Sequence, residues 1–264
     1  MKTRRAALLV ATASAALLLV ACSSPSGGGT SAAPPTSDRL GGTVTVLAAA
    51  SLTETFDALA TSFERLHPGV TITSSYGGSS ALASQIAQGA PADVFAAANE
   101  ATMKTVSDAG LTVGAPTRFA TNVLELVVPP GNPAHITSID DLAKAGVKVA
   151  LCDKTVPCGA AALQLFAAES ITVTPVTLEQ DVKAVLTKVE LDEVDAGLVY
   201  VTDAKTASGK VDAIEVPQAA KVINRYPIAV LKSSTNHDAA SAFVAYVLSK
   251  TGQAALKNAG FGAP

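Results

Sequence analysis

The sequence predicts an α/β fold with largely parallel sheets. From about residue 40 onward, short apolar segments alternate with longer segments of helical periodicity, and glycines stand at the breaks between them. Gly69, Gly89, Gly110 and Gly146 mark such breaks, since glycine commonly follows the end of a helix. The alternating part spans about 225 residues, which is enough for one large domain or two small ones.

Runs of apolar and β-branched residues are expected to form the strands. These runs lie at residues 43–48, 70–73, 93–98, 122–128, 147–151, 196–201, 213–216 and 226–231. The first helix is indicated by apolar residues that recur every three or four positions, namely Leu52, Phe56, Leu59, Phe63 and Leu66. Further helices are expected at residues 81–86, 100–109, 139–145, 160–169, 179–191 and 239–248.

The N-terminus predicts export. Lys2, Arg4 and Arg5 precede an uncharged apolar run at residues 6–21, which is short for a membrane span and typical of a secretory signal. The run ends in Leu-Val-Ala followed by Cys22, which resembles the bacterial lipobox. That resemblance implies cleavage after a signal peptide at 1–21, a diacylglycerol on the Cys22 thiol and attachment to the cell membrane. An ordinary cleavable signal with an incidental cysteine is the alternative.

Residues 22–39 are expected to form a flexible tether. Residues 23–38 are Ser, Gly, Pro, Thr, Ala and one Asp, with no aliphatic side chain larger than Ala. Such a segment cannot bury enough apolar surface to offset its ordering entropy. Without the three signal cations, 16 Lys and Arg face 22 Asp and Glu, a net charge of −6 with no basic block. Nucleic acid is therefore not an expected partner, and a bound anion must be held by local dipoles.

Two of the three cysteines, Cys152 and Cys158, lie in the part of the chain that is expected to fold. The oxidising compartment outside the cytoplasm permits a disulfide between them. Such a bond would stabilise the fold by roughly 2 kcal/mol, because it lowers the entropy of the unfolded chain. The alternative is two free thiols that lie on separate parts of the fold. Their C-x₅-C spacing is neither a redox C-x-x-C motif nor a metal knuckle.

Small and hydroxyl-bearing residues mark several turns between strands and helices. Open α/β sheets bind ligands at such turns, where helix N-termini are found. In residues 48–54, Ser51 and Glu54 have the S-x-x-E spacing of a capping box, so Ser51 either caps its helix or contacts a ligand. In residues 74–82, two glycines precede Ser79 and Ser80, which suits an anion nest or a merely flexible turn. The second turn has no Lys, which argues against a nucleotide P-loop.

Three later segments are weak signals singly. They are Val-Pro-Cys-Gly-Ala at 156–160, Glu-Gln-Asp-Val-Lys at 179–183 and Gly-Leu-Val-Tyr at 197–200. Tyr200 by itself could simply pack in the core. Taken together and in order, however, five motifs make residues 42–264 resemble the molybdate-binding proteins of bacterial ABC importers. These motifs are A-A-A-S-L (48–52), G-S-S-A-L-A-S-Q-I (78–86), G-A-P-A-D-V-F (89–95), V-P-C-G (156–159) and D-A-G-L-V-Y (195–200).

This resemblance implies the ligand site. The family holds its oxyanion with two serines, two backbone amides at helix starts and one tyrosine. Matched motif by motif, these groups are the hydroxyls of Ser51, Ser79 and Tyr200 and the amides of Cys158 and Val182. Some family members have Ala at the position of Cys158, a change that a backbone contact tolerates. The metal atom is reached only through its oxygens, with no direct protein ligand and no cofactor.

The resemblance also implies a type II periplasmic-binding-protein fold with two α/β lobes and two crossing segments. We expect lobe 1 at residues 40–121 plus 226–264, lobe 2 at residues 122–225, and the crossings near 120–124 and 223–226. The implied function is that of a monomeric extracytoplasmic lipoprotein, not an enzyme, which delivers molybdate and tungstate to a membrane permease. A ligand that touches both lobes would favour their closure.

Hydroxyls and backbone amides suit this ligand because molybdate is a dianion that only accepts hydrogen bonds. Asp93 and Asp181 lie near the turns. They are expected to cap helices or to brace the loops, since a carboxylate in contact with the dianion would repel it. His67, His135 and His237 are scattered and predict no metal site. An iron site formed by Tyr76, Tyr200 and Tyr226 would favour additional His or carboxylate ligands.

Other functions remain open on the residues alone. An enzyme with Ser51 or Cys158 as nucleophile would need a histidine base, but the sequence has no G-x-S-x-G elbow and no histidine in a motif-like context. A carrier of sulfate, thiosulfate or phosphate and a scaffold lipoprotein are further alternatives. An acceptor-free site disfavours phosphate, while only cavity size would separate molybdate from sulfate.

Overall fold

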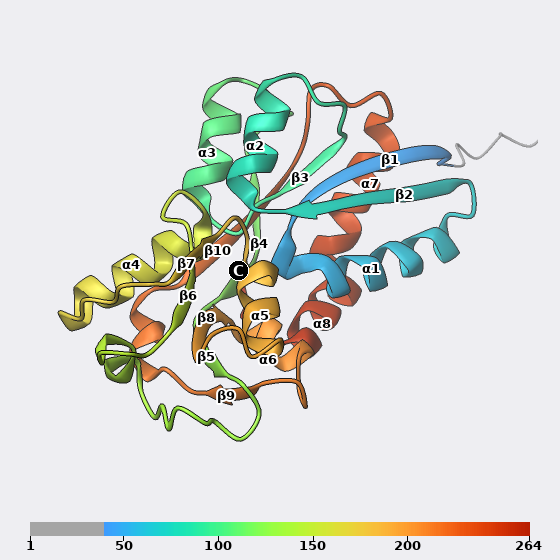
Figure 1. The fold of residues 1–264 in the computed structure, drawn as a ribbon. Helices are drawn as coiled ribbons and strands as arrows, with labels where there is room; N and C mark the ends of the chain where they lie inside the picture. Colours follow the sequence, from blue (N-terminus) through green and yellow to red (C-terminus); the bar gives the residue numbers. More distant parts are fainter. Residues whose placement is uncertain (1–39) are drawn as a thin grey trace, which may run out of the picture. The chain divides into compact units, whose positions relative to one another are not determined.

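The computed structural model describes residues 40–264, which form two five-stranded sheets (Figure 1). The expected signal peptide, tether and Cys22 lie outside the described residues. The first sheet has the order β2-β1-β3-β10-β4, with β1 Gly42–Ala49, β2 Val70–Gly77, β3 Val94–Ala96, β4 Thr117–Asn122 and β10 Asn224–Val230. The second has the order β7-β6-β8-β5-β9, with β5 Leu124–Val128, β6 Val149–Cys152, β7 Thr177–Glu179, β8 Ala196–Tyr200 and β9 Asp212–Ile214.

Helices cover the sheets. The α-helices are α1 Thr53–Leu66, α2 Ser79–Ala87, α3 Glu100–Asp108, α4 Pro157–Glu169, α5 Val182–Glu190, α6 Val201–Thr206, α7 His237–Leu248 and α8 Lys250–Ala259. Short 3₁₀ helices are η1 Ala50–Leu52, η2 Ile139–Ala143 and η3 Pro217–Lys221. Helices α2 and α3 lie on one side of the first sheet, and α1, α7 and α8 lie on the other (Figure 1).

The alternation of side chains along β1 explains how the first sheet packs on both faces. Val44 and Val46 join the core beneath α1 and α7, whereas Leu47 joins the core beneath α2 and α3. Phe63 and Phe243 pack edge to face in the first of these cores, with ring centroids 5.4 Å apart. These buried faces hold the carboxyl end of β1, where Ser51 follows, in a rigid position.

Both sheets are mixed, so the expectation of largely parallel sheets is wrong. In the first sheet β1 is parallel to β2 and β3, but β10 is antiparallel to β3 and β4. In the second sheet β6 is parallel to β7 and β8, but β5 is antiparallel to β8 and β9. Strands β5 and β10 enter their sheets directly from the other sheet, so no βαβ crossover imposes a parallel direction on them.

The chain passes from one sheet to the other twice. The segment expected as one strand at 122–128 is divided, because β4 ends at Asn122 in the first sheet and β5 begins at Leu124 in the second. The return falls between the end of η3 at Lys221 and the start of β10 at Asn224. The apolar run around Val123 conceals the first passage in the sequence. The lobe boundaries at 121/122 and 225/226 stay a proposal, which these two passages support.

Further elements differ from the expectation. The helix expected at 139–145 is the 3₁₀ helix η2, while β7, α6 and α8 were not expected as separate elements. Helix α8 escaped the periodicity because it contains Gly252 and few large apolar residues. In the part of the chain that the structure describes, no helix has the length and apolar character needed to span a membrane.

Candidate oxyanion site

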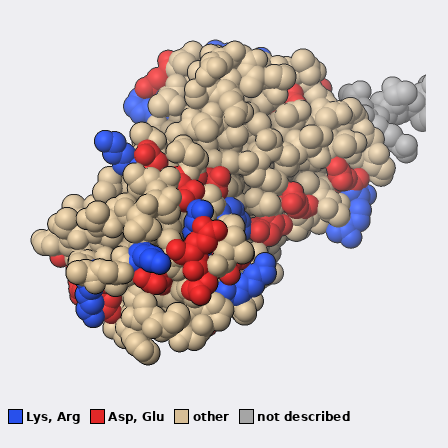
Figure 2. Space-filling view, viewed as in Figure 1, with Lys and Arg blue, Asp and Glu red and all other residues tan. Residues whose placement is uncertain are grey.

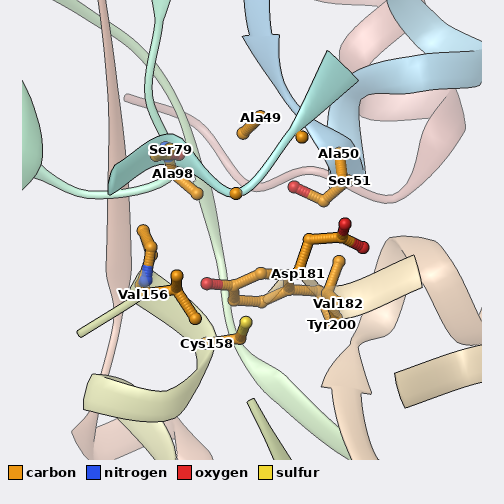
Figure 3. A pocket seen from close by; sticks show the side chains of 13 residues that line it. Ala49, Ala50, Ser51, Ser79, Ala98, Val156, Cys158, Asp181, Val182 and Tyr200 are labelled. Atoms are coloured by element: carbon orange, nitrogen blue, oxygen red, sulfur yellow. The ribbon is translucent and has the colours of Figure 1, made fainter. Parts of the chain in front are cut away.

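A small cavity lies where elements of the two sheets meet, and all five residues predicted to bind an oxyanion line it. Its lining consists of Ala49, Ala50, Ser51, Gly77, Gly78, Ser79, Ala98, Val156, Pro157, Cys158, Asp181, Val182 and Tyr200. Ser51 and Ser79 lie on one side, with Cys158, Val182 and Tyr200 opposite them (Figure 3). The volume of about 10 Å³ is close to the roughly 10–15 Å³ that one water molecule needs, so the cavity is small and nearly filled in this arrangement.

Three described α-helices begin at this cavity. Ser79 opens α2, Val182 opens α5, and Cys158 is the second residue of α4. The first N–H groups of a helix have no partner within the helix, and Pro157 has no N–H, so Cys158 carries the first N–H of α4. The positive ends of three helix dipoles therefore meet at one point, which favours an anion.

The three predicted hydroxyls are buried and hydrogen-bonded to the protein. Ser79 Oγ accepts from the N–H of Ala98 at 3.0 Å, and the Tyr200 hydroxyl accepts from Asn224 Nδ2 at 3.0 Å. Ser51 Oγ lies 3.0 Å from the hydroxyl of Tyr226. Burial raises the pKa of Tyr200 well above its usual value, so this hydroxyl remains protonated and is available as a donor.

The capping box expected at Ser51 and Glu54 is absent from the described structure. Ser51 lies in η1, the N-cap of α1 is Leu52, and Glu54 Oε1 instead accepts from Lys183 Nζ at 2.7 Å. The side chain of Ser51 is thus available to the cavity. The capping box failed because a 3₁₀ turn shifts the start of α1 beyond Ser51.

Asp93 and Asp181 brace the structure as predicted. Asp93 Oδ2 accepts from the N–H of Thr45 at 2.7 Å, and its Oδ1 accepts from Ser234 Oγ at 2.6 Å. Asp181 lines the cavity and is the N-cap of α5, where its Oδ1 accepts from the N–H of Ala184 at 2.9 Å. Asp181 is the one charged residue among the described lining residues.

Close contacts join the two sides of the cavity. The Cα of Gly78 packs so near the carbonyl of Gln180 that a Cβ at position 78 would lie 2.1 Å from that oxygen. Ser80 Oγ donates to the carbonyl of Thr155 at 2.5 Å, and Lys183 of α5 pairs with Glu54 of α1 at 2.7 Å. The structure therefore represents a closed arrangement.

Lys183 also connects the edge of the site to a buried carboxyl group. Its Nζ lies 3.3 Å from Asp203 Oδ1, an ion-pair contact whose geometry makes no hydrogen bond. Burial raises the pKa of Asp203 to about 6, although Lys183 and the N–H of Tyr200 lower it. Burial lowers the pKa of Lys183, but Asp203 and Glu54 outweigh it, so this pKa is raised overall. Lys183 is charged at neutral pH.

No lysine or arginine is among the described residues that line the cavity. On the face seen in Figure 2, cationic side chains lie among acidic ones and form no continuous basic area. An anion in this cavity would thus be held by neutral donors and helix dipoles rather than by a positive side chain.

The structure joins Cys152 and Cys158 in a disulfide. The bond ties the end of β6 to the first turn of α4, and it holds the Cys158 amide at the cavity. It also removes the thiol that a nucleophilic Cys158 would need. Neither His67, His135 nor His237 lines the cavity, so Ser51 has no histidine base there.

Of the residues considered for a metal, Tyr200 and Tyr226 pack against each other, but Tyr76 and the histidines do not join them. The hydroxyl of Tyr76 donates to Asp57 at 2.6 Å, away from the cavity, and His67 packs against Phe63. Among residues 40–264, no group of three His, Cys, Asp or Glu side chains could hold a metal ion.

Sequence reasoning missed Gly78, Ala98, Asn224 and Tyr226 as parts of this site. Gly78 was considered only as part of an anion nest or a flexible turn, and Tyr226 only as part of a crossing segment or as an iron ligand. Asn224 stands at the start of a strand that follows more than a hundred residues after Ala98, its partner. Such pairings leave no local signal in a single sequence.

Comparison with known proteins agrees with this fold. Residues 44–262 match the family described as bacterial extracellular solute-binding proteins, and the chain belongs to this family. It is accordingly a binding protein and not an enzyme.

Individual relatives have more specific descriptions than the family. The chain is 44% identical over 221 residues to a molybdate-binding protein of Mycobacterium tuberculosis, an alignment that covers 84% of this chain and 85% of the relative. The solved periplasmic molybdate-binding protein of Azotobacter vinelandii superimposes with a TM-score of 0.71 at 21% identity, covering 84% of this chain and 99% of the other. The sulfate-binding protein SubI of M. tuberculosis reaches 0.70 at 22% identity, covering 83% and 86%. At these identities the two structures support the two-lobe fold alone.

Proposed function

We propose that this protein captures molybdate, and also tungstate, outside the cytoplasm and delivers it to the membrane permease of an ABC importer. The observation that carries the proposal is the convergence of three helix N-termini and three buried hydroxyls on one small cavity without a cationic side chain among its described lining residues. The 44% identity to a molybdate-binding protein supports the choice of ion.

The oxygens of the ion would contact the hydroxyls of Ser51, Ser79 and Tyr200 and the backbone amides of Cys158 and Val182. Charge-assisted hydrogen bonds contribute about 1.5–3 kcal/mol each, so several in a dry cavity offset the cost of removing a dianion from water. Because Ser51 and Ser79 lie opposite the other three groups, the ion would link the two lobes and favour their closed arrangement.

Calorimetry with molybdate, tungstate, sulfate and phosphate tests the proposal. We expect molybdate and tungstate to bind tightly and to raise the melting temperature in proportion to the logarithm of their concentration at saturation. Tight sulfate binding without molybdate binding would instead identify a sulfate carrier and refute the proposed ligand.

Removing a serine hydroxyl tests the site. We expect Ser51→Ala and Ser79→Ala each to weaken molybdate binding by about 1–3 kcal/mol, because each leaves one oxygen of the ion without a donor. Ser62→Ala, at a half-buried position of α1 that is not among the lining residues of the cavity, serves as the control. Unchanged affinity in both site variants would contradict the assigned contacts.

We further propose that Cys22 carries a lipid that anchors the protein to the cell membrane, and that the protein acts there as a monomer. Mass spectrometry of membrane-extracted protein should find an acylated Cys22 as the first residue. A mature chain that begins at Ser23 would contradict the anchor without affecting the proposed ligand.

A further inference from the structure

Asn224 makes two hydrogen bonds that together determine where the proton of the Tyr200 hydroxyl can point. Asn224 is buried, and its Nδ2 donates to the carbonyl of Ala98 at 2.9 Å and to the Tyr200 hydroxyl at 3.0 Å. A carbonyl only accepts, so the contact with Ala98 places the NH₂ group, and not the amide oxygen, beside Tyr200. The Tyr200 oxygen must therefore accept from Asn224, and its proton points elsewhere.

Two acceptors are available for that proton. The proton can turn toward the neighbouring Tyr226, whose ring packs edge to face against that of Tyr200 with centroids 5.9 Å apart, or into the cavity that Tyr200 lines. A dianion in the cavity is the stronger acceptor, because charge-assisted hydrogen bonds are about twice as strong as neutral ones. With an ion bound, Tyr200 then donates into the cavity, and Tyr226 is free to donate to Ser51 Oγ, 3.0 Å away.

The same rule applies to Ser79. Its oxygen accepts from the N–H of Ala98, a group that can only donate, so the Ser79 proton is left for the cavity. The backbone of Ala98 thus holds two side chains in place: its N–H donates to Ser79, and its carbonyl accepts from Asn224. Ser79 and Tyr200 thus each accept one hydrogen bond from a protein donor, which leaves their own protons to point elsewhere.

We propose that Asn224 is a positioning residue that sets specificity: by donating to Tyr200 it directs the Tyr200 proton into the cavity, so that the site rejects oxyanions that carry a proton. This inference rests on the proposed function. A protonated oxyanion such as hydrogen arsenate or hydrogen phosphate needs an acceptor for its own O–H, and Tyr200 presents a donor to the cavity instead. A fully deprotonated oxyanion such as molybdate needs donors alone.

The test compares molybdate with hydrogen arsenate, a tetrahedral dianion that differs in carrying one proton, by calorimetry at mildly alkaline pH. In Asn224→Leu the Tyr200 oxygen regains a free acceptor site. We expect the ratio of the arsenate Kd to the molybdate Kd to fall about tenfold or more. Asn224→Asp keeps the size of the side chain, and its carboxyl oxygen would accept the Tyr200 proton, so the ratio should fall there too. The second variant keeps the test valid if the first does not fold.

Two further variants separate positioning from a purely structural role. In a Tyr200→Phe background the hydroxyl is gone, so we expect Asn224→Leu to leave the ratio unchanged. Asp181→Asn keeps an oxygen for the helix cap but removes the one carboxylate that lines the cavity. This variant tests the rival acceptor for the O–H of the ligand: the ratio changes in it only if the Asp181 carboxylate, and not Tyr200, sets the preference.

The outcomes are distinct. A ratio that stays constant in folded Asn224 variants, or that changes in Asp181→Asn instead, would overturn this inference while leaving molybdate binding intact. A wild-type protein that binds no oxyanion would refute the proposed function and this inference together.

Discussion

A single methyl group at position 78 is expected to abolish tight ligand binding. The Cβ of Gly78→Ala would lie 2.1 Å from the carbonyl oxygen of Gln180 and 3.3 Å from Val156 Cγ1, on the opposite side of the cavity. The first of these neighbours is backbone, so no side-chain rotation relieves the overlap. Gly78 has φ −61° and ψ 126°, which alanine adopts readily, and the open protein should accept the substitution.

We therefore expect Gly78→Ala to weaken molybdate binding about 100-fold without lowering the stability of the ligand-free protein. Overpacking typically costs about 1–3 kcal/mol, and here that cost falls on the closed arrangement alone. Calorimetry gives the affinity, and small-angle X-ray scattering shows whether ligand still compacts the chain.

Gly77→Ala is the matched control. Its Cβ would make an ordinary contact of 3.8 Å with Leu82 on the same side of the cavity. This neighbouring variant should bind as the wild type does. Similar affinity in Gly78→Ala and wild type would mean that the ligand binds without the contact between Gly78 and Gln180.

The buried carboxyl of Asp203 is expected to make stability depend on pH. Its pKa of about 6 in the folded protein lies above the ordinary 3.8, because burial disfavours the charged form. Between these two values the folded state holds a proton that the unfolded state has released. The contribution of Asp203 to stability is therefore greatest at acid pH and falls as the pH rises through 6.

Asp203→Asn removes this titration. Relative to the wild type, the variant should gain about 2–3 kcal/mol of unfolding free energy as the pH rises from about 4 to 7, since each pKa unit corresponds to about 1.4 kcal/mol. Lys183 keeps Glu54 as a partner in this variant. Chemical denaturation across this pH range measures the difference.

Asp140→Asn, an exposed residue of η2, controls for the general effect of removing one carboxylate. Its difference from wild type should stay nearly constant with pH. A constant difference for Asp203→Asn as well would show that Lys183 compensates the burial of Asp203 fully.

Local patterns predicted the parts of this protein that depend on neighbouring residues. The spacing of Phe56, Leu59 and Phe63 placed α1, because one face of a helix must meet the core every three or four residues. The turns at Ser51, Ser79 and Tyr200 were found because strands end there and helices begin. The family motifs then supplied roles for the same turns.

Contacts between segments that are distant in the sequence could not be predicted from local patterns. The antiparallel entry of β10 depends on the return of the chain from the second sheet, which no local periodicity records. The sequence pattern also suggested that Ser51 caps a helix. In the structure Ser51 lies in the 3₁₀ helix η1, and α1 begins after it.

The sequence by itself determined the α/β character of the chain, the turns that line the cavity and the absence of a basic block, since composition and local periodicity encode these features. Tertiary structure alone decided that Gly78 meets Gln180, that Lys183 joins Glu54 to Asp203, and that Asn224 orients Tyr200. Each of these contacts joins residues brought together only by folding. Directional hydrogen bonds and steric overlap act over a few ångströms, so their partners are defined only after the two sheets have assembled.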